Sequence, residues 1–325
     1  CTSPNKYGGP GALYYRKRTS SGWQADELVS NSAIEESSIA LDSQGNIHVT
    51  WSQGHIHYRK KGSSGWETDT HIYSDGYVQS YPTIAVDLDD HIHIIWIGGS
   101  AGGNDTVRHI EYTDSWQSAE LIYTANGLAD YPGPSMAIDD NNYLHVVFYD
   151  PDSGSTYPTV YQIIYLKYTN SWQARELVTD NAGQQREPSI GLDKSGNVYV
   201  AWTGYGLGTC TTNFNIQIRK KTSGGWQTPF CLTDIPVDCW EPSLFRGSFG
   251  VPKTGYGLIF AFSNTKIYWY GSLDLEWTTY KFLRSQANIL ITSQKDLQTQ
   301  GNLGAVTSNF KDLETQANIL GSSFK

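Results

Sequence analysis

Carboxylate and aromatic side chains recur at one repeated position of the chain, just before an apolar segment that is similar in every copy. Aligning the copies gives Glu36, Tyr81, a Tyr131/Gly133 position, Glu187 and Glu241, with Arg186 and Trp240 alongside. Carboxylates accept hydrogen bonds from sugar hydroxyls, and aromatic rings stack on the apolar faces of sugars. We therefore expect a glycan-binding site that includes Tyr81, Tyr131, Arg186, Glu187, Trp240 and Glu241.

The same acidic residues also allow an enzyme. Glycoside hydrolysis uses two carboxylates across the scissile bond, about 5 to 5.5 Å apart for retention and about 6.5 to 9.5 Å apart for inversion. For that role the residues to test are Glu36, Glu187 and Glu241. Because the chain carries no recognisable catalytic signature, we assign no catalytic residue, and a non-enzymatic binding module is the first hypothesis.

Repeated hairpins must position these residues. The segment SSIALDSQGNIHVTW (37–51) recurs as PTIAVDLDDHIHIIW (82–96), PSMAIDDNNYLHVVF (134–148) and PSIGLDKSGNVYVAW (188–202), with a degenerate fifth copy over 242–262. In each copy an apolar run ends in Asp, a turn follows, and a second run alternates with period two, which predicts a β-hairpin. A third strand and a Trp-marked fourth strand follow each hairpin, so the repeated unit is a four-stranded blade.

These units predict an all-β fold, with a flexible leader over 1–12 and a β-propeller over 13–282. An additional third and fourth strand at 12–29 precede the first hairpin, which favours six blades, with five as the alternative. Residues 283–325 form a Gln/Asn/Ser/Thr-rich repeat tail, in which TQGNLGAVTS (299–308) resembles SQGNIHVTWS (43–52). We expect this tail to supply ring-closing or assembly strands.

The segments DSQGNIHVTW and DKSGNVYVAW resemble the repeats of sialidase-like propellers of the BNR type. The resemblance covers about residues 13–282, at the level of the repeat. It implies the propeller fold. The Asp box of that family reads Ser-x-Asp-x-Gly-x-x-Trp, and here an extra residue separates Asp42 from Gly45. The resemblance therefore supports the fold and does not extend to sialidase activity.

Aspartates in the hairpin turns are candidates for a structural or a metal-binding role. Calcium prefers such oxygen ligands, and the best candidates are Asp87, Asp89, Asp139 and Asp140. Tight hairpins demand the same residue types, so we expect a structural role and no required cofactor. Histidines recur at one strand position, which also indicates packing: His48, His93 and His145, with Tyr199 equivalent.

The cysteines suggest an oxidising compartment. Cys210, Cys231 and Cys239 cluster late in the chain, and secreted proteins commonly join such loops by disulfides. We expect Cys239 to bond to Cys210 or to Cys231. The sequence opens on Cys1, which is a candidate for lipidation, for a disulfide or for a fragment boundary.

The charge of −9 argues against a nucleic-acid partner, because phosphate binding needs a clustered basic face. No apolar run approaches the about 20 residues of a membrane-spanning helix. We expect a secreted, extracellular or cell-surface-attached, lectin-like adhesion module that recognises a glycan or a cell-surface protein through its long-loop face. A further alternative is a structural subunit of a surface filament or viral appendage, in which residues 283–325 join copies into a homo-oligomer or filament.

Overall fold

A computed structural model of the chain describes residues 11–34, 36–99, 106–125, 133–151, 154–193, 195–233, 238–244, 258–263 and 266–272. At residues 33, 34 and 241 and in the last two ranges, only the backbone is described. All of these residues belong to one compact unit, Cys1–Arg284. The second unit, Ser285–Lys325, lies outside the described residues, and so do Cys1, the predicted leader and the predicted role of the tail.

Four sheets have the predicted blade order, from an inner strand to an outer edge, with the fourth strand of two blades in two short parts. The first comprises β5 (Ser37–Leu41), β6 (Ile47–Ser52), β7 (Ile56–Gly62), β8 (Gly65–Trp66) and β9 (Thr70–Tyr73). The second comprises β10 (Gln79–Val86), β11 (Ile92–Gly98), β12 (Thr106–Tyr112) and β13 (Glu120–Thr124). The third comprises β14 (Ser135–Ile138), β15 (Leu144–Pro151), β16 (Tyr161–Tyr168) and β17 (Glu176–Leu177). The fourth comprises β18 (Gln185–Leu192), β19 (Val198–Gly204), β20 (Asn215–Thr222), β21 (Gly225–Trp226) and β22 (Phe230–Cys231).

Two incomplete blades flank these four in the sequence. The leading one pairs β1 (Gly11–Tyr15) with β4 (Glu27–Ile34), and its tip is the hairpin of β2 (Arg18–Thr19) and β3 (Gly22–Trp23). The last described one contains β23 (Cys239–Leu244), β24 (Leu258–Ser263) and β25 (Lys266–Ser272). The predicted leading outer pair and the degenerate fifth hairpin are therefore both confirmed.

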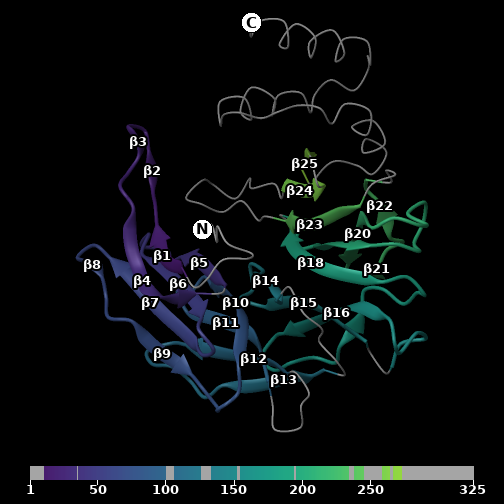
Figure 1. The fold of residues 1–325 in the computed structure, drawn as a ribbon. Coiled ribbons are helices and arrows are strands. Elements are labelled where there is room, and N and C mark those ends of the chain that lie inside the picture. Colours follow the sequence, from purple (N-terminus) through teal and green to yellow (C-terminus); the bar gives the residue numbers. More distant parts are fainter. Residues whose placement is uncertain are drawn as a thin grey trace, which may run out of the picture. The chain divides into compact units, whose positions relative to one another are not determined.

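The inner strands follow one another around a common centre (Figure 1). Contacts run from β5 to β10, from β10 to β14, from β14 to β18 and from β18 to β23. The core lies between successive sheets, where the tryptophans of the second strands, Trp51, Trp96 and Trp202, are fully buried. This radial packing of antiparallel sheets is a β-propeller. Among the described residues there is no helix long and apolar enough to cross a membrane.

The inner face of the first full blade is less covered than the same face of later blades. Ile39 and Leu41 on β5 are 42% and 40% exposed, whereas their repeat equivalents Ile84 and Leu192 are 6% and 1% exposed. In later blades the first strand packs against the inner hairpin of the preceding blade, as β10 does against β5 and β6 and β18 does against β14 and β15. The leading blade contributes only its outer pair to the described residues. Six blades and five blades therefore both stay predictions.

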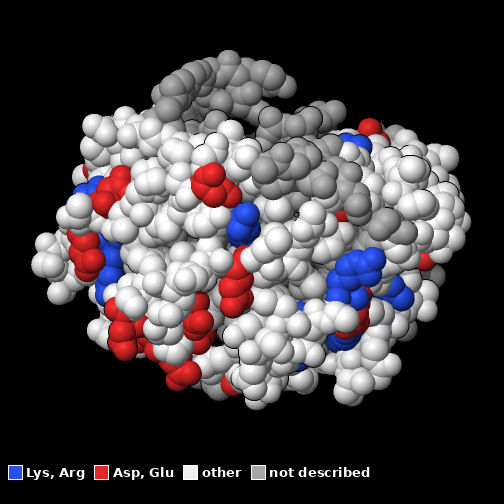
Figure 2. All heavy atoms as spheres, turned by 90° about the horizontal axis from the view of Figure 1, so that it is seen from below, with Lys and Arg blue, Asp and Glu red and all other residues white. Residues whose placement is uncertain are grey.

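On the side shown in Figure 2, the described Lys and Arg side chains do not form one basic face. Figure 2 shows one side of the molecule, on which Lys and Arg occur in small groups, some of them beside Asp and Glu, with wide neutral areas between them. Ion pairs among the described residues also bring opposite charges together, such as Lys61 with Glu27 and Lys220 with Asp193. The surface on this side lacks the continuous basic stripe that typifies nucleic-acid-binding proteins.

Tryptophans near the start of three of the described fourth strands join neighbouring blades. The indole Nε1 atoms of Trp66, Trp172 and Trp226 donate to carboxylates on the preceding blade, at Glu27, Glu120 and Glu176. In the last pair the N···O distance is 2.8 Å, and Lys221 also pairs with the Glu176 carboxylate. Each such Glu–Trp contact links two sheets whose backbones do not pair with each other.

We expect Glu176→Ala to lower the free energy of unfolding by about 1 to 2 kcal/mol, because it leaves the partly buried indole and ammonium groups without their acceptor. Urea unfolding followed by tryptophan fluorescence measures this loss. The control is Asp114→Ala, which removes an exposed acidic side chain from a turn. Equal stability of the two variants would contradict an energetic role for the Glu–Trp contact.

Candidate functional site

The structure brings three of the aligned positions together at the inner edges of consecutive blades. The backbone N–H of Tyr81 faces the carboxylate of Glu36, with 3.4 Å between N and Oε2. A Cβ atom added at Gly133 would lie 2.3 Å from the Cβ atom of Tyr81, so only glycine fits there. Glu36, Tyr81 and Gly133 therefore lie beside one another, whereas Tyr131 lies outside the described residues.

Most of these positions lie inside the inner strands rather than before them. The bulges in β10, β18 and β23 contain, respectively, Tyr81 with Pro82, Glu187 with Pro188 and Glu241 with Pro242. A bulge leaves the extra residue out of the ladder and changes the direction of its side chain. Glu36 and Gly133 precede their strands, β5 and β14, as the sequence predicted.

Two of the bulges hold strained backbone. Tyr81 has a φ of 56° and Glu187 a φ of 54°, the left-handed region that non-glycine residues rarely adopt. A following proline further disfavours helical backbone at the residue before it. Such outliers cost free energy and persist where the surroundings impose them, often at binding or catalytic sites. The inner ends of the second and fourth blades are therefore candidate functional positions.

Beside the bulges, aromatic and cationic side chains from adjacent blades pair with each other. The guanidinium of Arg186 lies 4.9 Å from the ring centroid of Tyr161, which begins β16 of the preceding blade. Trp240 stands at the equivalent position of the next blade, and its ring lies 4.5 Å from that of Phe214. Tyr205 packs edge-on against Phe214 at 5.1 Å. All of these side chains are partly exposed, so their rings combine packing with accessible surface.

Sequence reasoning missed Tyr161, Phe214 and Tyr205. The first two have a readable signal, because each directly precedes the apolar run of a third strand, in YQIIYL and FNIQIR. It also missed Asp150, a fully buried carboxylate that accepts a hydrogen bond from the Tyr123 hydroxyl at 2.9 Å. Asp150 occupies the strand position that is glycine in the second and fourth blades. This replacement of glycine by a carboxylate was visible in the sequence.

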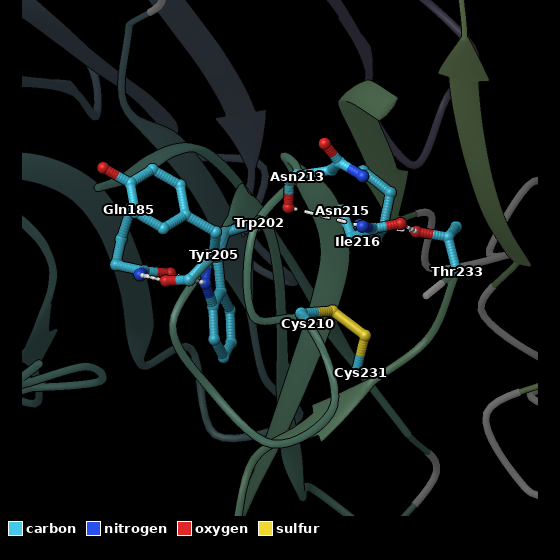
Figure 3. Close-up of a disulfide and its surroundings, with 9 residues drawn as sticks. All are labelled: Gln185, Trp202, Tyr205, Cys210, Asn213, Asn215, Ile216, Cys231 and Thr233. Atoms are coloured by element: carbon cyan, nitrogen blue, oxygen red, sulfur yellow. Dashed lines mark hydrogen bonds between the residues drawn. A yellow bond between two sulfur atoms is a disulfide. The ribbon is translucent and has the colours of Figure 1, made fainter. Parts of the chain in front are cut away.

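Buried glutamines hold the loops that enter two inner strands. The side-chain carbonyls of Gln79 and Gln185 accept hydrogen bonds from the indole N–H groups of Trp96 and Trp202, at 2.7 and 2.6 Å. Their amide groups donate back to the preceding loop, and that of Gln185 also reaches the backbone carbonyl of Tyr205 at 2.6 Å (Figure 3). These networks fix loop residues beside the bulges before any ligand arrives.

Two of the three candidate catalytic carboxylates have similar partners. Glu36 accepts from the Ser52 hydroxyl at 2.7 Å, and Glu187 accepts from the Thr203 hydroxyl at 3.3 Å. Both donors follow the buried tryptophan of the second strand, so the two contacts repeat one geometry. The side chain of Glu241 lies outside the described residues, and a role of these carboxylates in hydrolysis stays a prediction.

The turn aspartates have the contacts that a structural role requires. Asp87 and Asp139 each accept backbone N–H groups from residues two and four positions later, at 2.8 to 3.0 Å. The side chain of Asp89 accepts from Asn142 of the next blade at 2.6 Å. Asp87, Asp89 and His91 have potential ligand atoms within 4.8 Å of one another. Calcium binding at Asp87, Asp89, Asp139 or Asp140 stays an untested alternative to the structural role.

The recurring histidines join these turns to the core. The ring of His145 lies between the carboxylate of Asp139, at 3.2 Å from Nε2, and the hydroxyl of Tyr165, at 2.6 Å from Nδ1. His48 repeats this arrangement with Asp42 and Tyr58. Because the carboxylate can only accept, the neutral ring donates through Nε2 and accepts the phenol proton at Nδ1. The repeated geometry agrees with the predicted packing role.

Burial and hydrogen bonding shift the pKa values in these networks. Burial lowers the pKa of His145 and outweighs the raising effect of Asp139. For Asp139, burial acts to raise the pKa, but hydrogen bonds from His145 and from the turn lower it to about 2. In the second blade, burial lowers the pKa of His109 to about 3, and His93 adds to the shift. The imidazoles of His145 and His109 are therefore neutral at neutral pH.

The disulfide differs from the predicted one. Cys210 bonds to Cys231, with 5.7 Å between their Cα atoms, so the prediction that Cys239 forms the bond was wrong. Cys231 lies on β22, which pairs with β20, and the loop before β20 returns Cys210 to the same blade (Figure 3). Cys239 begins the inner strand of the next blade, where it is a buried thiol, and burial raises its pKa.

No protein-family model matches the chain, and no curated protein matches it either. Solved structures do resemble it. A polysaccharide lyase of family PL25, an ulvan lyase bound to -[GlcA(1-4)Rha3S]-, has a TM-score of 0.56 at 10% identity, covering 82% of this chain and 80% of that one. The α-L-arabinanase of Penicillium chrysogenum, complexed with arabinobiose, has a TM-score of 0.53 at 10% identity, covering 83% and 85%. A Dyadobacter fermentans protein of unknown function has a TM-score of 0.51 at 16% identity, covering 74% and 79%. At these identities the likeness shows a shared fold, and the chain is a β-propeller.

Proposed function

We propose that this protein is an extracellular glycan-binding propeller whose site lies at the inner edges of the blades. The supporting observation is the pair of inter-blade contacts, Tyr161 with Arg186 and Phe214 with Trp240, beside strained inner-strand bulges. Partly exposed rings offer the flat apolar surfaces on which sugars stack, and neighbouring polar groups orient the hydroxyls. The intrachain disulfide is consistent with an oxidising compartment.

Two structural neighbours have saccharides bound in their structures, which agrees with this proposal. The resemblance to sialidase-like repeats supports only the four-stranded blade and gives no argument about activity. Binding without chemistry is our first choice, because Glu36 and Glu187 repeat one hydroxyl contact in two blades. A single catalytic centre would instead place unlike groups around one bond.

Retention on a panel of immobilised polysaccharides tests the proposal. We expect Trp240→Ala to weaken binding about tenfold or more, because a buried ring contact is worth about 1.5 to 3 kcal/mol. Trp240→Phe, which keeps a ring, should retain most of the affinity. The control is Trp23→Ala, since Trp23 is 63% exposed on the outer tip of the leading blade. Equal loss in both alanine variants, or no retention of the wild-type protein, would contradict the proposal.

Glycoside hydrolysis is the second candidate function, and the left-handed backbone of Glu187 is the observation that favours it. Mass spectrometry of the same polysaccharides after incubation detects released fragments. Fragments that disappear in Glu187→Gln or Glu241→Gln would make the protein an enzyme. Retention without fragments would keep it a binding module.

A further inference from the structure

We propose that Arg186 binds an acidic group of the glycan, a carboxylate or a sulfate, so that the ligand is an acidic polysaccharide. This inference rests on the proposed function and names the substrate class of the same site. It starts from the partners of the arginine side chains, since a guanidinium in a folded protein is normally paired with an acceptor.

Arg186 differs from the other arginines for which the structure gives partners. Arg16 pairs with Asp26 at 3.0 Å, and Arg108 pairs with Asp75 at 3.4 Å. Arg59 and Arg219 donate to backbone carbonyl oxygens of the preceding blade, at Val29 and Val178. The guanidinium of Arg186 contacts the Tyr161 ring, and within the described part of the chain it has no carboxylate or carbonyl acceptor.

Part of this guanidinium is also removed from solvent. The Nε atom of Arg186 is buried and has no hydrogen-bond partner among the described residues. A buried donor without an acceptor costs free energy, more so when it is charged. The terminal nitrogens of this partly exposed side chain can instead donate to a ligand oxygen, which would form a charge-assisted hydrogen bond with the unpaired guanidinium. The planar guanidinium suits the two oxygens of a carboxylate or sulfate.

Arg186 also occupies a repeated position at which the residue type differs from blade to blade. The residue before the bulge is Ser80 in β10, Arg186 in β18 and Trp240 in β23. One fold position thus presents a hydroxyl, a cation and an aromatic ring in different blades. Residues that vary at a repeated position are suited to specificity, since the fold does not demand any one of them.

The two inter-blade pairs lie on successive blades. Tyr161 and Arg186 join the third and fourth blades, and Phe214 and Trp240 join the fourth blade and the incomplete blade that contains β23. A saccharide chain that crosses the fourth blade would contact the Phe214–Trp240 ring pair with the apolar face of one sugar. Another of its sugars would lie beside the Arg186 guanidinium. We therefore expect a polymer in which acidic and apolar sugar surfaces occur within a few residues of each other.

Matched polysaccharides test this inference on the full chain. Polygalacturonate and its carboxyl-reduced form differ only in the carboxylate, and dextran sulfate and dextran differ only in the sulfate. We expect the wild-type protein to bind at least one acidic form about tenfold or more tightly than its neutral counterpart, a gap that narrows as salt concentration rises. Which acidic form binds tells whether the group is a carboxylate or a sulfate.

Variants assign the effect to Arg186. Arg186→Met should remove most of the preference for the acidic form, and Arg186→Lys should restore part of it, because lysine keeps the charge without the fork. Arg16→Met is the control, since it makes the same charge change on the leading blade. Circular dichroism and thermal unfolding show whether each variant is folded.

The outcomes separate this inference from the proposed function. Tight binding of neutral and acidic forms alike would overturn the role of Arg186 and leave glycan binding standing. An equal loss in Arg186→Met and Arg16→Met would show a general charge effect and would also overturn it. Binding of neither form nor of any other polysaccharide would overturn both proposals.

Discussion

Lowering the pH from about 7 to about 5 is expected to reduce the free energy of unfolding by about 2 kcal/mol or more. The cause is three buried imidazoles, His48, His109 and His145, whose pKa values burial lowers below the usual 6.5. Below that pH the unfolded chain binds protons that the folded chain does not. Stability therefore falls as the pH decreases, by about 1.4 kcal/mol per pH unit for each imidazole that stays neutral.

The turn aspartates add a second acid step. Hydrogen bonds lower the pKa values of Asp42, Asp87 and Asp139, although burial opposes this. Their stabilising contribution is present above the unfolded pKa of 3.8 and is lost as the pH falls through the folded values. The stability curve should therefore drop first through the histidine range and again in stronger acid.

Guanidinium unfolding at a series of pH values, followed by tryptophan fluorescence, measures this curve. His109→Gln should reduce the loss between neutral pH and about pH 5 by a third or more, because it removes an imidazole that stays neutral over this whole range. The control is His71→Gln, which replaces an exposed histidine and should leave the slope unchanged. The same slope in His109→Gln as in the wild-type protein would show that buried histidines do not govern the acid sensitivity.

The repeated part of the fold was readable in the sequence because each blade is formed by local strand pairing. Alternation in IHVTW and its copies predicted the hairpins, and Asp followed by a short polar segment predicted the turns, which the structure confirms. The leading outer pair was likewise visible before any hairpin. Local patterns suffice where every partner strand is the next one along the chain.

The candidate site was harder to predict from the sequence, because it depends on contacts between blades. Glu36 and Tyr81 were aligned correctly by the repeat, and the structure joins them. The ring partners of Arg186 and Trp240 come from the preceding blade, at a position that pairing within one blade does not reveal. The residue before a proline is normally extended, so the left-handed backbone of Glu187 could not be predicted from its type.

The disulfide supplies the other large effect on stability. Cys210 and Cys231 are 21 residues apart. A crosslink of that span lowers the conformational entropy of the unfolded chain, which stabilises the folded state by about 3 kcal/mol. We expect Cys210→Ala/Cys231→Ala to lower the free energy of unfolding by about that amount. Cys239→Ala is the control and should cost only about 1 kcal/mol, the effect of a small buried cavity. A mass-spectrometric peptide map without reduction checks the pairing, and a crosslinked Cys239 would contradict it.

Glycan affinity should respond differently from stability in the same variant. The disulfide attaches the loop between β19 and β20, which carries Tyr205 and Phe214, to β22, but Phe214 has two further attachments to the next blade. Its N–H donates to the Asp238 carboxylate at 3.0 Å, and its carbonyl accepts from the backbone N–H of Cys239 at 2.7 Å. These bonds do not depend on the disulfide, so Phe214 should stay beside Trp240 in variant molecules that remain folded. We therefore expect Cys210→Ala/Cys231→Ala to unfold at lower denaturant and still bind polysaccharide with nearly wild-type affinity. A loss of affinity matching that of Trp240→Ala in folded protein would instead mean that the disulfide itself holds the ring pair in place.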